Sequence, residues 1–373
     1  MGPSVSPSTT GLPHTVAVVG GGVIGLSCAW RAASAGFAVT VHDPAPGSGA
    51  SHVAGGMLAP VIEAVPAEQE VLALGAASLR RWPGFAAELA TAGADPGLQT
   101  RGTLAVALDP GDRAELDRLA EQLSGMGRQV EVLSGREARR AEPSLGPQVR
   151  RALSVPGDLS VDNRALMNAL LVACRNVGVG FRDQRCTALP AADVVVLAAG
   201  AHSAGLHPAL VRAIRPVKGE ILRLRSRPGT LPPPSRTVRA IVGGRHSYLV
   251  PRNGGWLVLG ATQREVGFDT DVTAGAVREL LADAERVLPT IAEYTLEETA
   301  AGLRPGSPDN LPVIGELEPG VLAATGHHRH GILLAPLTAD AVLALLRGMP
   351  VPLEARPAAP TRLGCGLAAV SEP

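Results

Sequence analysis

Near its start the chain shows two different spacings of apolar residues. Residues 15–19 form a short β-rich run, residues 26–36 repeat apolar side chains with the helical period, and residues 37–41 form a second β-rich run that closes on Asp43. Glycines separate the first run from the helical segment. This pattern predicts a strand, a glycine-rich turn, a helix and a second strand, in that order.

Farther along, helical and strand-like segments alternate without an internal repeat. Helical patterns are predicted at 69–82, 112–124, 164–176, 274–288 and 339–346. Strand-like runs are predicted at 103–108, 193–198, 221–224, 247–250, 256–259 and 321–324. The mixture predicts an α/β fold, α+β overall, in which a parallel sheet is joined to a smaller domain built on an antiparallel sheet.

Composition and charge remove several classes of protein. Lys and Arg together number 34, as do Asp and Glu, so the formal net charge of zero gives no reason to expect a nucleic-acid or membrane partner. The four cysteines form no CxxC pair and no zinc spacing, so we expect no metal site, no disulfide framework and a cytoplasmic location. Residues 1–13 lack the apolar segment of a signal peptide and are predicted to be a loose leader.

The glycines after the first β-rich run have the spacing of a dinucleotide-binding turn. Gly20, Gly22 and Gly25 form G-x-G-x-x-G directly after a predicted strand and at the start of a predicted helix. Such glycines permit a tight turn, a close approach of the backbone to a pyrophosphate and close packing of the helix on the strand. Asp43 stands where a carboxylate accepts hydrogen bonds from ribose hydroxyls and repels a 2′-phosphate. We therefore predict a Rossmann-like dinucleotide-binding domain that does not use NADP.

The next segment favours FAD over NAD. Residues 47–60, GSGASHVAGGMLAP, form a loop of small residues that lets backbone amides approach a cofactor extending beyond its pyrophosphate, as FAD does. The second half of the chain shows no convincing catalytic Lys, His–Asp or Tyr–Lys set of an NAD-dependent dehydrogenase.

Both predicted domains are discontinuous, because strand-like runs late in the chain belong with the first sheet. The predicted FAD-binding domain comprises 14–85, 150–215 and 300–348, the substrate domain comprises 86–149 and 216–299, and 1–13 and 349–373 are loose termini.

Motifs along most of the chain resemble the glycine oxidase branch of the D-amino-acid oxidase and sarcosine oxidase flavoproteins. The matching segments are VAVVGGGVIGLSCAWRAASAG, GSGASHVAGGMLAP, ADVVVLAAGAHS, PVKGE, YLVPR, LVLGAT, AGLRPGSPDNLPVIG and AATGHHRHGILLAP, of which the last two are the most specific. The resemblance implies a noncovalently bound FAD and oxidation of glycine by hydride transfer to flavin N5. The implied products are an imino acid and hydrogen peroxide, with the imine feeding the thiazole moiety of thiamine.

The resemblance also assigns residues to the cofactor. The implied FAD contacts are Gly20, Gly22, Val23, Ile24, Gly25, Asp43, Ala50, Ser51, Gly55, Gly56, Met57, His327, His328, Arg329, His330, Gly331, Ile332 and Leu333. Cys186 and Thr187 fall where the backbone of relatives passes the adenine side.

A second set of residues is assigned to the substrate. The planar fork of an arginine binds a carboxylate through two hydrogen bonds, and the resemblance implies such a clamp from Arg304 and Arg329, with Tyr248 donating a further bond. Arg304 is predicted to lie in a rigid Pro-Gly turn. His246 would face the same side of its strand as Tyr248 and help deprotonate the substrate ammonium, while a solvated histidine is the competing interpretation. Met57 is expected beside the flavin, as a wall or a participant.

The chain departs from the family pattern near the flavin. Relatives often carry an aromatic residue and an Asn where this chain has His328 and His330, and a Met where it has Gln263. The stretch 182–193 is short, so a strand hairpin expected there is trimmed.

The expected partners are a small amino acid and oxygen, with a homo-oligomeric assembly and a hand-off of the imine to thiazole synthase. The alternatives are an oxidase of sarcosine or small D-amino acids, a quinone-linked D-amino acid dehydrogenase, a flavin-binding protein without turnover and an NAD-dependent dehydrogenase. The volume of the pocket decides among amines, and oxygen consumption separates an oxidase from a dehydrogenase.

Overall fold

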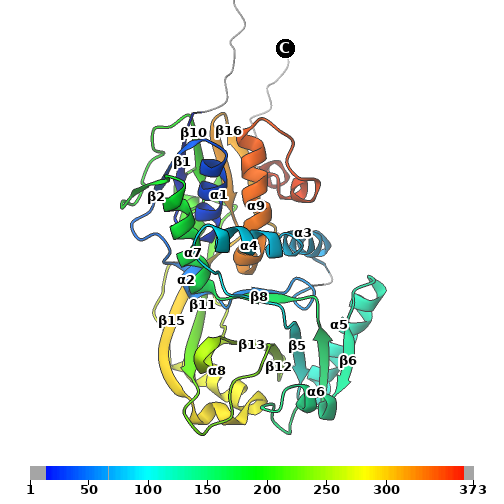
Figure 1. Ribbon diagram of the computed structural model, residues 1–373. Coiled ribbons are helices and arrows are strands. Elements are labelled where there is room, and N and C mark those ends of the chain that lie inside the picture. The colour runs from blue at the N-terminus through cyan, green and yellow to red at the C-terminus, as the bar shows by residue number, and fades with distance from the viewer. Residues whose placement is uncertain (1–13, 66, 365–373) are drawn as a thin grey trace, which may run out of the picture.

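The computed structural model describes residues 14–65 and 67–364, whose strands form three sheets (Figure 1). The first, here called the parallel sheet, has the strand order β16-β17-β10-β1-β2-β9. Its members are β16 (Val313–Glu318), β17 (Val321–Thr325), β10 (Val194–Leu197), β1 (Thr15–Val19), β2 (Ala38–His42) and β9 (Gly180–Arg182). Neighbouring strands are parallel except β16, which pairs with β17 in the antiparallel sense.

The central strand β1 is buried on both faces. Val16 and Val18 enter the core formed with the helices on one face, whereas Ala17 and Val19 pack with Leu210 on the other. Side chains of a strand point alternately to the two faces, so an apolar run without polar alternation is what a doubly covered parallel strand requires. The helices of the first face are α1 (Val23–Ser34), α3 (Gln69–Leu79), α4 (Trp82–Thr91), α7 (Asn163–Asn176) and α9 (Gly331–Leu346).

The helix α9 is apolar on most of its surface because it is a core helix. Within the described chain, His328–Leu346 is the one helical segment long and apolar enough to cross a membrane. However, 67% of its most apolar stretch is buried inside the protein. It packs against α1 and α3 (Figure 1).

The second sheet, here called the large sheet, has the strand order β15-β11-β14-β13-β12-β5-β7-β6. Its members are β15 (Thr295–Gly306), β11 (Arg215–Arg225), β14 (Trp256–Gly260), β13 (Arg245–Pro251), β12 (Thr237–Val242), β5 (Thr103–Ala107), β7 (Arg151–Val155) and β6 (Glu131–Ser134). Its pairs are antiparallel except β12 with β5. It packs with α5 (Pro110–Gly125), α6 (Gly135–Ala141) and α8 (Ala274–Val287).

A small third sheet and a short helix lie between the other two sheets. The small sheet consists of β3 (Met57–Leu58), β8 (Leu159–Val161) and β4 (Leu98–Gln99), and the short helix is α2 (Ala50–Val53). The long strands β11 and β15 run from the large sheet up to α2, side by side (Figure 1).

The predicted fold class is confirmed, and three differences concern single elements. The predicted helix at 69–82 is two helices, α3 and α4, because Pro83 occupies the first turn of a new helix, where its missing N–H is harmless. The helix predicted at 339–346 begins at Gly331 and runs through Pro336. The strand β7 lies in the large sheet, although 150–215 was predicted to belong to the FAD-binding domain.

The loose C-terminal tail predicted from residue 349 is wrong for the part that the structure describes. Two 3₁₀ helices, Leu353–Ala358 and Pro360–Leu363, follow α9, and Ala355 and Ala358 are buried. The Arg362 side chain binds the Asp309 carboxylate and the Leu311 carbonyl oxygen. Residues 1–13 and Cys365 lie outside the described residues, while Cys28 and Cys174 are buried free thiols.

We expect Trp82→Phe to lower the free energy of unfolding by about 1–3 kcal/mol. Trp82 is fully buried, and its indole N–H donates to the Leu333 carbonyl oxygen in α9 at 2.9 Å, a bond that phenylalanine cannot make. Urea denaturation followed by circular dichroism measures the loss. Half-buried Trp256→Phe is the control, and an equal loss in both variants would contradict this assignment.

Candidate active site

A cavity of about 970 Å³ lies between the parallel sheet and the large sheet. Its walls include Val19 and His42 at the carboxyl ends of β1 and β2, and Ala324 at that of β17. The chain leaves β1 toward β2 on one side, and β10 lies on the other. Ligands of open α/β sheets bind at this kind of reversal point, outside the carboxyl ends of the strands.

The glycine turn after β1 leaves no room for side chains. A Cβ atom on Gly20, whose φ is +109°, would lie 2.3 Å from the Ala198 carbonyl oxygen, and one on Gly25 would lie 1.8 Å from the Gly20 carbonyl oxygen. Gly20 and Gly22 line the cavity, whereas Gly25 does not. Gly25 therefore serves the packing of α1 on β1 rather than ligand contact, which corrects its assignment as a contact.

Asp43 lies in the cavity wall, where the sequence predicted a ribose-binding carboxylate. Its Oδ2 atom accepts from the Gly21 N–H at 2.7 Å, and its Oδ1 atom accepts from the Ala45 N–H at 2.7 Å. These bonds fix the carboxylate beside the glycine turn. Cys186 and Thr187 line the same cavity.

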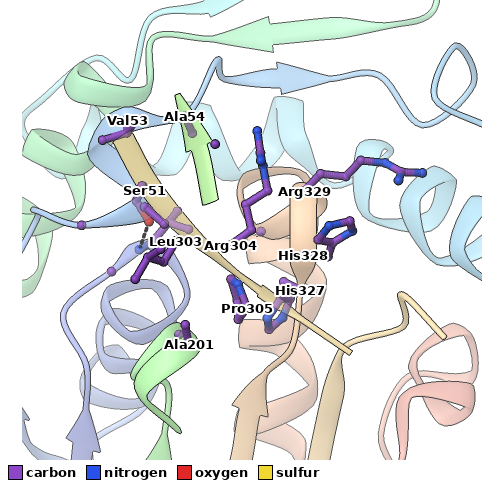
Figure 2. A pocket seen from close by; sticks show the side chains of 18 of the residues that line it. Ser51, Val53, Ala54, Ala201, Leu303, Arg304, Pro305, His327, His328 and Arg329 are labelled. Atoms are coloured by element: carbon purple, nitrogen blue, oxygen red, sulfur yellow. Dashed lines mark hydrogen bonds between the residues drawn. The ribbon is translucent and has the colours of Figure 1, made fainter. Parts of the chain in front are cut away.

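The N-terminus of α1 is held against α2. The Val23 N–H donates to the Ser51 hydroxyl at 3.0 Å, the bond drawn as a dashed line in Figure 2. Val23, Ile24, Ala50 and Ser51, which the sequence assigned to the cofactor, all line the cavity. The exposed N–H groups and dipole of a helix N-terminus suit the pyrophosphate of a dinucleotide.

Tyr248 enters the cavity from β13 through a slot between two glycines. A Cβ atom on Gly55 would lie 2.7 Å from its Cε2 atom, and one on Gly260 would lie 2.4 Å from its hydroxyl oxygen. Gly55, Gly56 and Met57 form the neighbouring wall. The described residues offer the Tyr248 hydroxyl no hydrogen-bond partner, so this group is available to a ligand.

Arg304 projects into the cavity from β15, not from the rigid turn that the sequence suggested. It pairs with Val217 of β11, and its guanidinium lies over Gly219, where any Cβ atom would be 2.3 Å away. Its Nη1 atom donates to the Thr262 carbonyl oxygen at 3.1 Å. No carboxylate of the described residues forms an ion pair with it, and burial lowers its pKa.

Arg329, the second arginine of the predicted clamp, lines the cavity but is paired with a carboxylate of the protein. The Arg329 Nη2 atom binds Glu68 Oε2 at 3.1 Å and the Glu63 carbonyl oxygen at 3.4 Å. Figure 2 shows the Arg329 side chain extending away from Arg304. Glu68 neutralises Arg329, and sequence spacing gave no sign of this pairing.

Three buried histidines follow β17. His327 and His328 line the cavity, and burial lowers the pKa of each to about 3. Burial lowers the pKa of His330 to about 4. These histidines are therefore neutral at physiological pH.

Two predicted cofactor contacts at this turn face elsewhere. His330 borders a small void beside Glu63 and Glu68, with its Nδ1 atom 3.6 Å from Glu63 Oε2. The Leu333 carbonyl oxygen accepts bonds from Ser78 and Trp82 in the core. Gly331 and Ile332 do line the cavity.

His246 lies at the outer edge of the cavity. Its Nε2 atom is 3.0 Å from Glu115 Oε1, and its side chain is 52% exposed. Burial, together with nearby Arg239, lowers its pKa. The contact with Glu115 and the exposure of the side chain favour the solvated histidine over a base that acts on the substrate.

Sequence reasoning missed several residues of the wall. Glu63 is largely buried and lines the cavity. It lies 3.4 Å from Arg239, which pairs across the sheet with Tyr248. Gly219 belongs to the PVKGE motif, but the sequence assigned it no role. A glycine inside a strand indicates that another group approaches the backbone closely, and here that group is the Arg304 guanidinium. Glu63 carried no signal, because only the fold brings it to Arg239.

The cavity fits a dinucleotide that continues beyond its pyrophosphate. The close-packed glycine turn, the helix N-terminus and Asp43 occupy one part, and Met57, Tyr248 and Arg304 occupy another. Among the described residues, no group of three or more His, Cys, Asp or Glu side chains is placed to hold a metal ion.

Comparison with known proteins agrees with this geometry. The bifunctional protein ThiO/ThiG of Nostoc sp. is 32% identical over 90% of this chain, and the chain spans about half of that relative, 53%. The glycine oxidase of Pseudomonas putida is 33% identical over 94% of this chain and 99% of its own length. The crystal structure of glycine oxidase from Geobacillus kaustophilus matches with a TM-score of 0.86 at 32% identity, covering 94% of this chain and 99% of that one.

The family model described as FAD dependent oxidoreductase, DAO, matches residues 15–345. That range includes the glycine turn, Asp43, Tyr248 and Arg304. The chain therefore belongs to the FAD dependent oxidoreductase family, and FAD is the dinucleotide that its cavity accommodates.

Proposed function

We propose that this protein is an FAD-dependent glycine oxidase that converts glycine and oxygen to an imino acid and hydrogen peroxide. The observation that carries the proposal is the Arg304 guanidinium, which lies in the cavity without a carboxylate partner. An unpaired cation in a half-buried site is stabilised by an anionic ligand. The likeness to glycine oxidases over nearly the whole chain supports glycine as that ligand.

Among the half-buried arginines that the structure describes in the cavity wall, Arg304 alone lacks a carboxylate partner. Arg329 is paired with Glu68, and Arg239 is paired with Glu63, whereas Arg304 has only backbone carbonyl oxygens. The neutral histidines add no further positive charge. Arg185 and Arg264 also line the cavity, but both are exposed, so Arg304 is the half-buried guanidinium that suits the carboxylate of a substrate.

Arg304 and Tyr248 orient the substrate in this proposal. The guanidinium fork binds the carboxylate through two charge-assisted bonds, and the Tyr248 hydroxyl donates a further bond. Both side chains project from strands of the same sheet, so their separation is fixed before the substrate arrives. Because these groups are already fixed, they align the bound substrate, and the entropy cost of aligning two molecules freely in water does not add to the reaction barrier.

The cofactor is proposed to be held without a covalent bond. The glycine turn and the α1 N-terminus bind its pyrophosphate, Asp43 binds its ribose, and Gly55, Gly56 and Met57 line its redox end. When bound, FAD supplies the two-electron redox chemistry that protein side chains lack. Glu63 and the histidines stay in fixed protonation states near neutral pH, because the pKa of each lies below its ordinary value.

The biological setting is also a proposal. Relatives in which this kind of chain is fused in a bifunctional ThiO/ThiG protein support a role in thiamine biosynthesis, with the imine passed to thiazole synthase. We further propose that the protein works in the cytoplasm and as a homo-oligomer. Sarcosine and small D-amino acids are the second candidate substrates, because Arg304 serves their carboxylate equally well.

An anaerobic titration with glycine tests the proposed function. The purified protein is expected to be yellow, to lose its visible flavin absorbance as glycine is added, and to recover its colour with release of peroxide when air returns. Bleaching by sarcosine or D-alanine but not by glycine would show that glycine is not the substrate and that one of these amines is. If the reduced flavin regains its colour with a quinone but not with oxygen, the protein is a dehydrogenase and not an oxidase.

Arg304→Ala is expected to lower kcat/KM for glycine on the order of 100-fold or more while the protein keeps bound FAD. Among the described residues of the cavity wall, Arg304 is the only half-buried arginine without a carboxylate partner, and the variant removes its guanidinium. Exposed Arg212→Ala, which lies outside the cavity, is the matched control. Turnover equal to that of the control would exclude Arg304 as the carboxylate site.

Acid is expected to destabilise the protein partly through His330. Its pKa is near 6.5 in the unfolded chain and about 4 in the folded state, so below pH 6.5 the unfolded chain binds the proton more tightly. The stability that neutral His330 gives above pH 6.5 is therefore lost as the pH falls toward 4. Between pH 7.5 and 5 this residue should account for about 2 kcal/mol of the loss.

The variant His330→Asn removes this titrating group and should flatten the dependence of the melting temperature on pH over that range. Exposed His14→Asn is the control and should keep the slope of the unmodified protein. A slope unchanged by His330→Asn would show that other groups cause the acid sensitivity.

A further inference from the structure

Arg252 is a buried arginine outside the cavity that joins both of its walls. It follows directly after β13, four residues beyond Tyr248, and its side chain is 5% exposed. Its Nη2 atom donates to the Gly55 carbonyl oxygen at 2.8 Å and lies 3.4 Å from Asn163 Oδ1. The guanidinium thus connects the strand that carries Tyr248 with the loop that carries Met57.

The partners of Arg252 are themselves fixed. The Asn163 amide donates to the Ser51 and His52 carbonyl oxygens at 3.0 and 2.8 Å, which holds α2. Asp162 caps the first turn of α7 through the N–H groups of residues 164 and 165, and its Oδ2 atom lies 3.5 Å from Arg252 Nε. Arg252 therefore anchors the Gly55 loop to a helix terminus that cannot move independently.

The Gly55 loop has no spare room on either side. On one side, the Gly55 backbone packs against the Tyr248 ring so closely that a Cβ atom would lie 2.7 Å from it. On the other side, a Cβ atom on Gly56 would lie 2.1 Å from the Val161 carbonyl oxygen and 2.9 Å from Arg252 Nη2. A shift of Gly55 is therefore transmitted to the Tyr248 ring.

We propose that Arg252 is a positioning residue, which holds the Gly55 carbonyl so that the cofactor-side loop and the Tyr248 hydroxyl keep one fixed separation. This inference rests on the proposed function, in which Tyr248 binds the substrate carboxylate. Arg252 touches neither the substrate nor the cofactor in this role, and it acts through Gly55 and Tyr248.

The environment of Arg252 argues against a role in stability alone. Its Nε atom is buried without a hydrogen-bond partner, and burial lowers its pKa to about 10. A buried charge with incomplete pairing is often replaceable by an apolar side chain without loss of stability. What an apolar side chain cannot supply is the donor to the Gly55 carbonyl oxygen.

The test compares Arg252→Met and Arg252→Lys with Arg236→Met. Arg236 is the matched control because it also pairs with a carboxylate, that of Glu142, but lies away from the cavity. The readouts are the melting temperature, the FAD content and visible spectrum, the Kd for acetate as an inert carboxylate, and kcat and KM for glycine.

We expect Arg252→Met to melt within a few degrees of Arg236→Met, yet to shift the flavin absorbance and to lose kcat on the order of 10- to 100-fold. Arg236→Met should keep the unmodified spectrum and kcat. Arg252→Lys restores one donor without the planar fork, so its kcat should be intermediate. If Arg252→Met does not fold, the lysine variant carries the same comparison.

A double-mutant cycle with Tyr248→Phe tests the route of action. If Arg252 acts through Tyr248, Arg252→Lys should lower kcat/KM less than about threefold further once the hydroxyl is gone. Fully additive losses would overturn the proposal, as would folded Arg252 variants with unmodified spectrum, acetate Kd and kcat. The spectrum and the acetate Kd need no turnover, so they report on Arg252 even if glycine is not the substrate.

Discussion

The antiparallel pairing of β11 with β15 is the contact on which the rest of the site depends. The two strands stay paired from Arg215 opposite Gly306 to Arg225 opposite Thr295, and they carry the large sheet up to α2 and the cavity. This pairing places the Arg304 guanidinium over Gly219. Because β15 is hydrogen-bonded to β11 on both sides of Arg304, the residue is held on a regular strand and its side chain points to the cavity.

Charge balance selects which group of the cavity can bind an anion. Several arginines line or approach the space, but Glu63 and Glu68 neutralise two of those nearest to Arg304. Burial also keeps the neighbouring histidines uncharged. The positive charges nearest to Arg304 are therefore neutralised, and its half-buried guanidinium matches an amino acid with one carboxylate.

The two histidines that depart from the family pattern have separate consequences. His328 lines the cavity, whereas His330 lies behind it, beside Glu63. His328 in place of an aromatic residue therefore changes the cavity wall. His330 in place of an Asn changes the buried electrostatics beside Glu63. Neither histidine carries a positive charge at neutral pH, so the proposed anion site is unaffected by their titration.

The sequence by itself determined the strands of the parallel sheet, the glycine turn and Asp43, because these features depend on neighbours close along the chain. It predicted one loop over residues 47–60, where the structure has helix α2 and strand β3. It also indicated Tyr248 and Arg304 through motifs, but placed Arg304 in a turn. Only the tertiary structure decided that Arg329 binds Glu68, that His246 binds Glu115, and that Arg252 holds the Gly55 carbonyl oxygen. The physical reason is that ion pairs and hydrogen bonds between distant segments depend on the spatial arrangement of whole elements, which local periodicity and motif spacing do not encode.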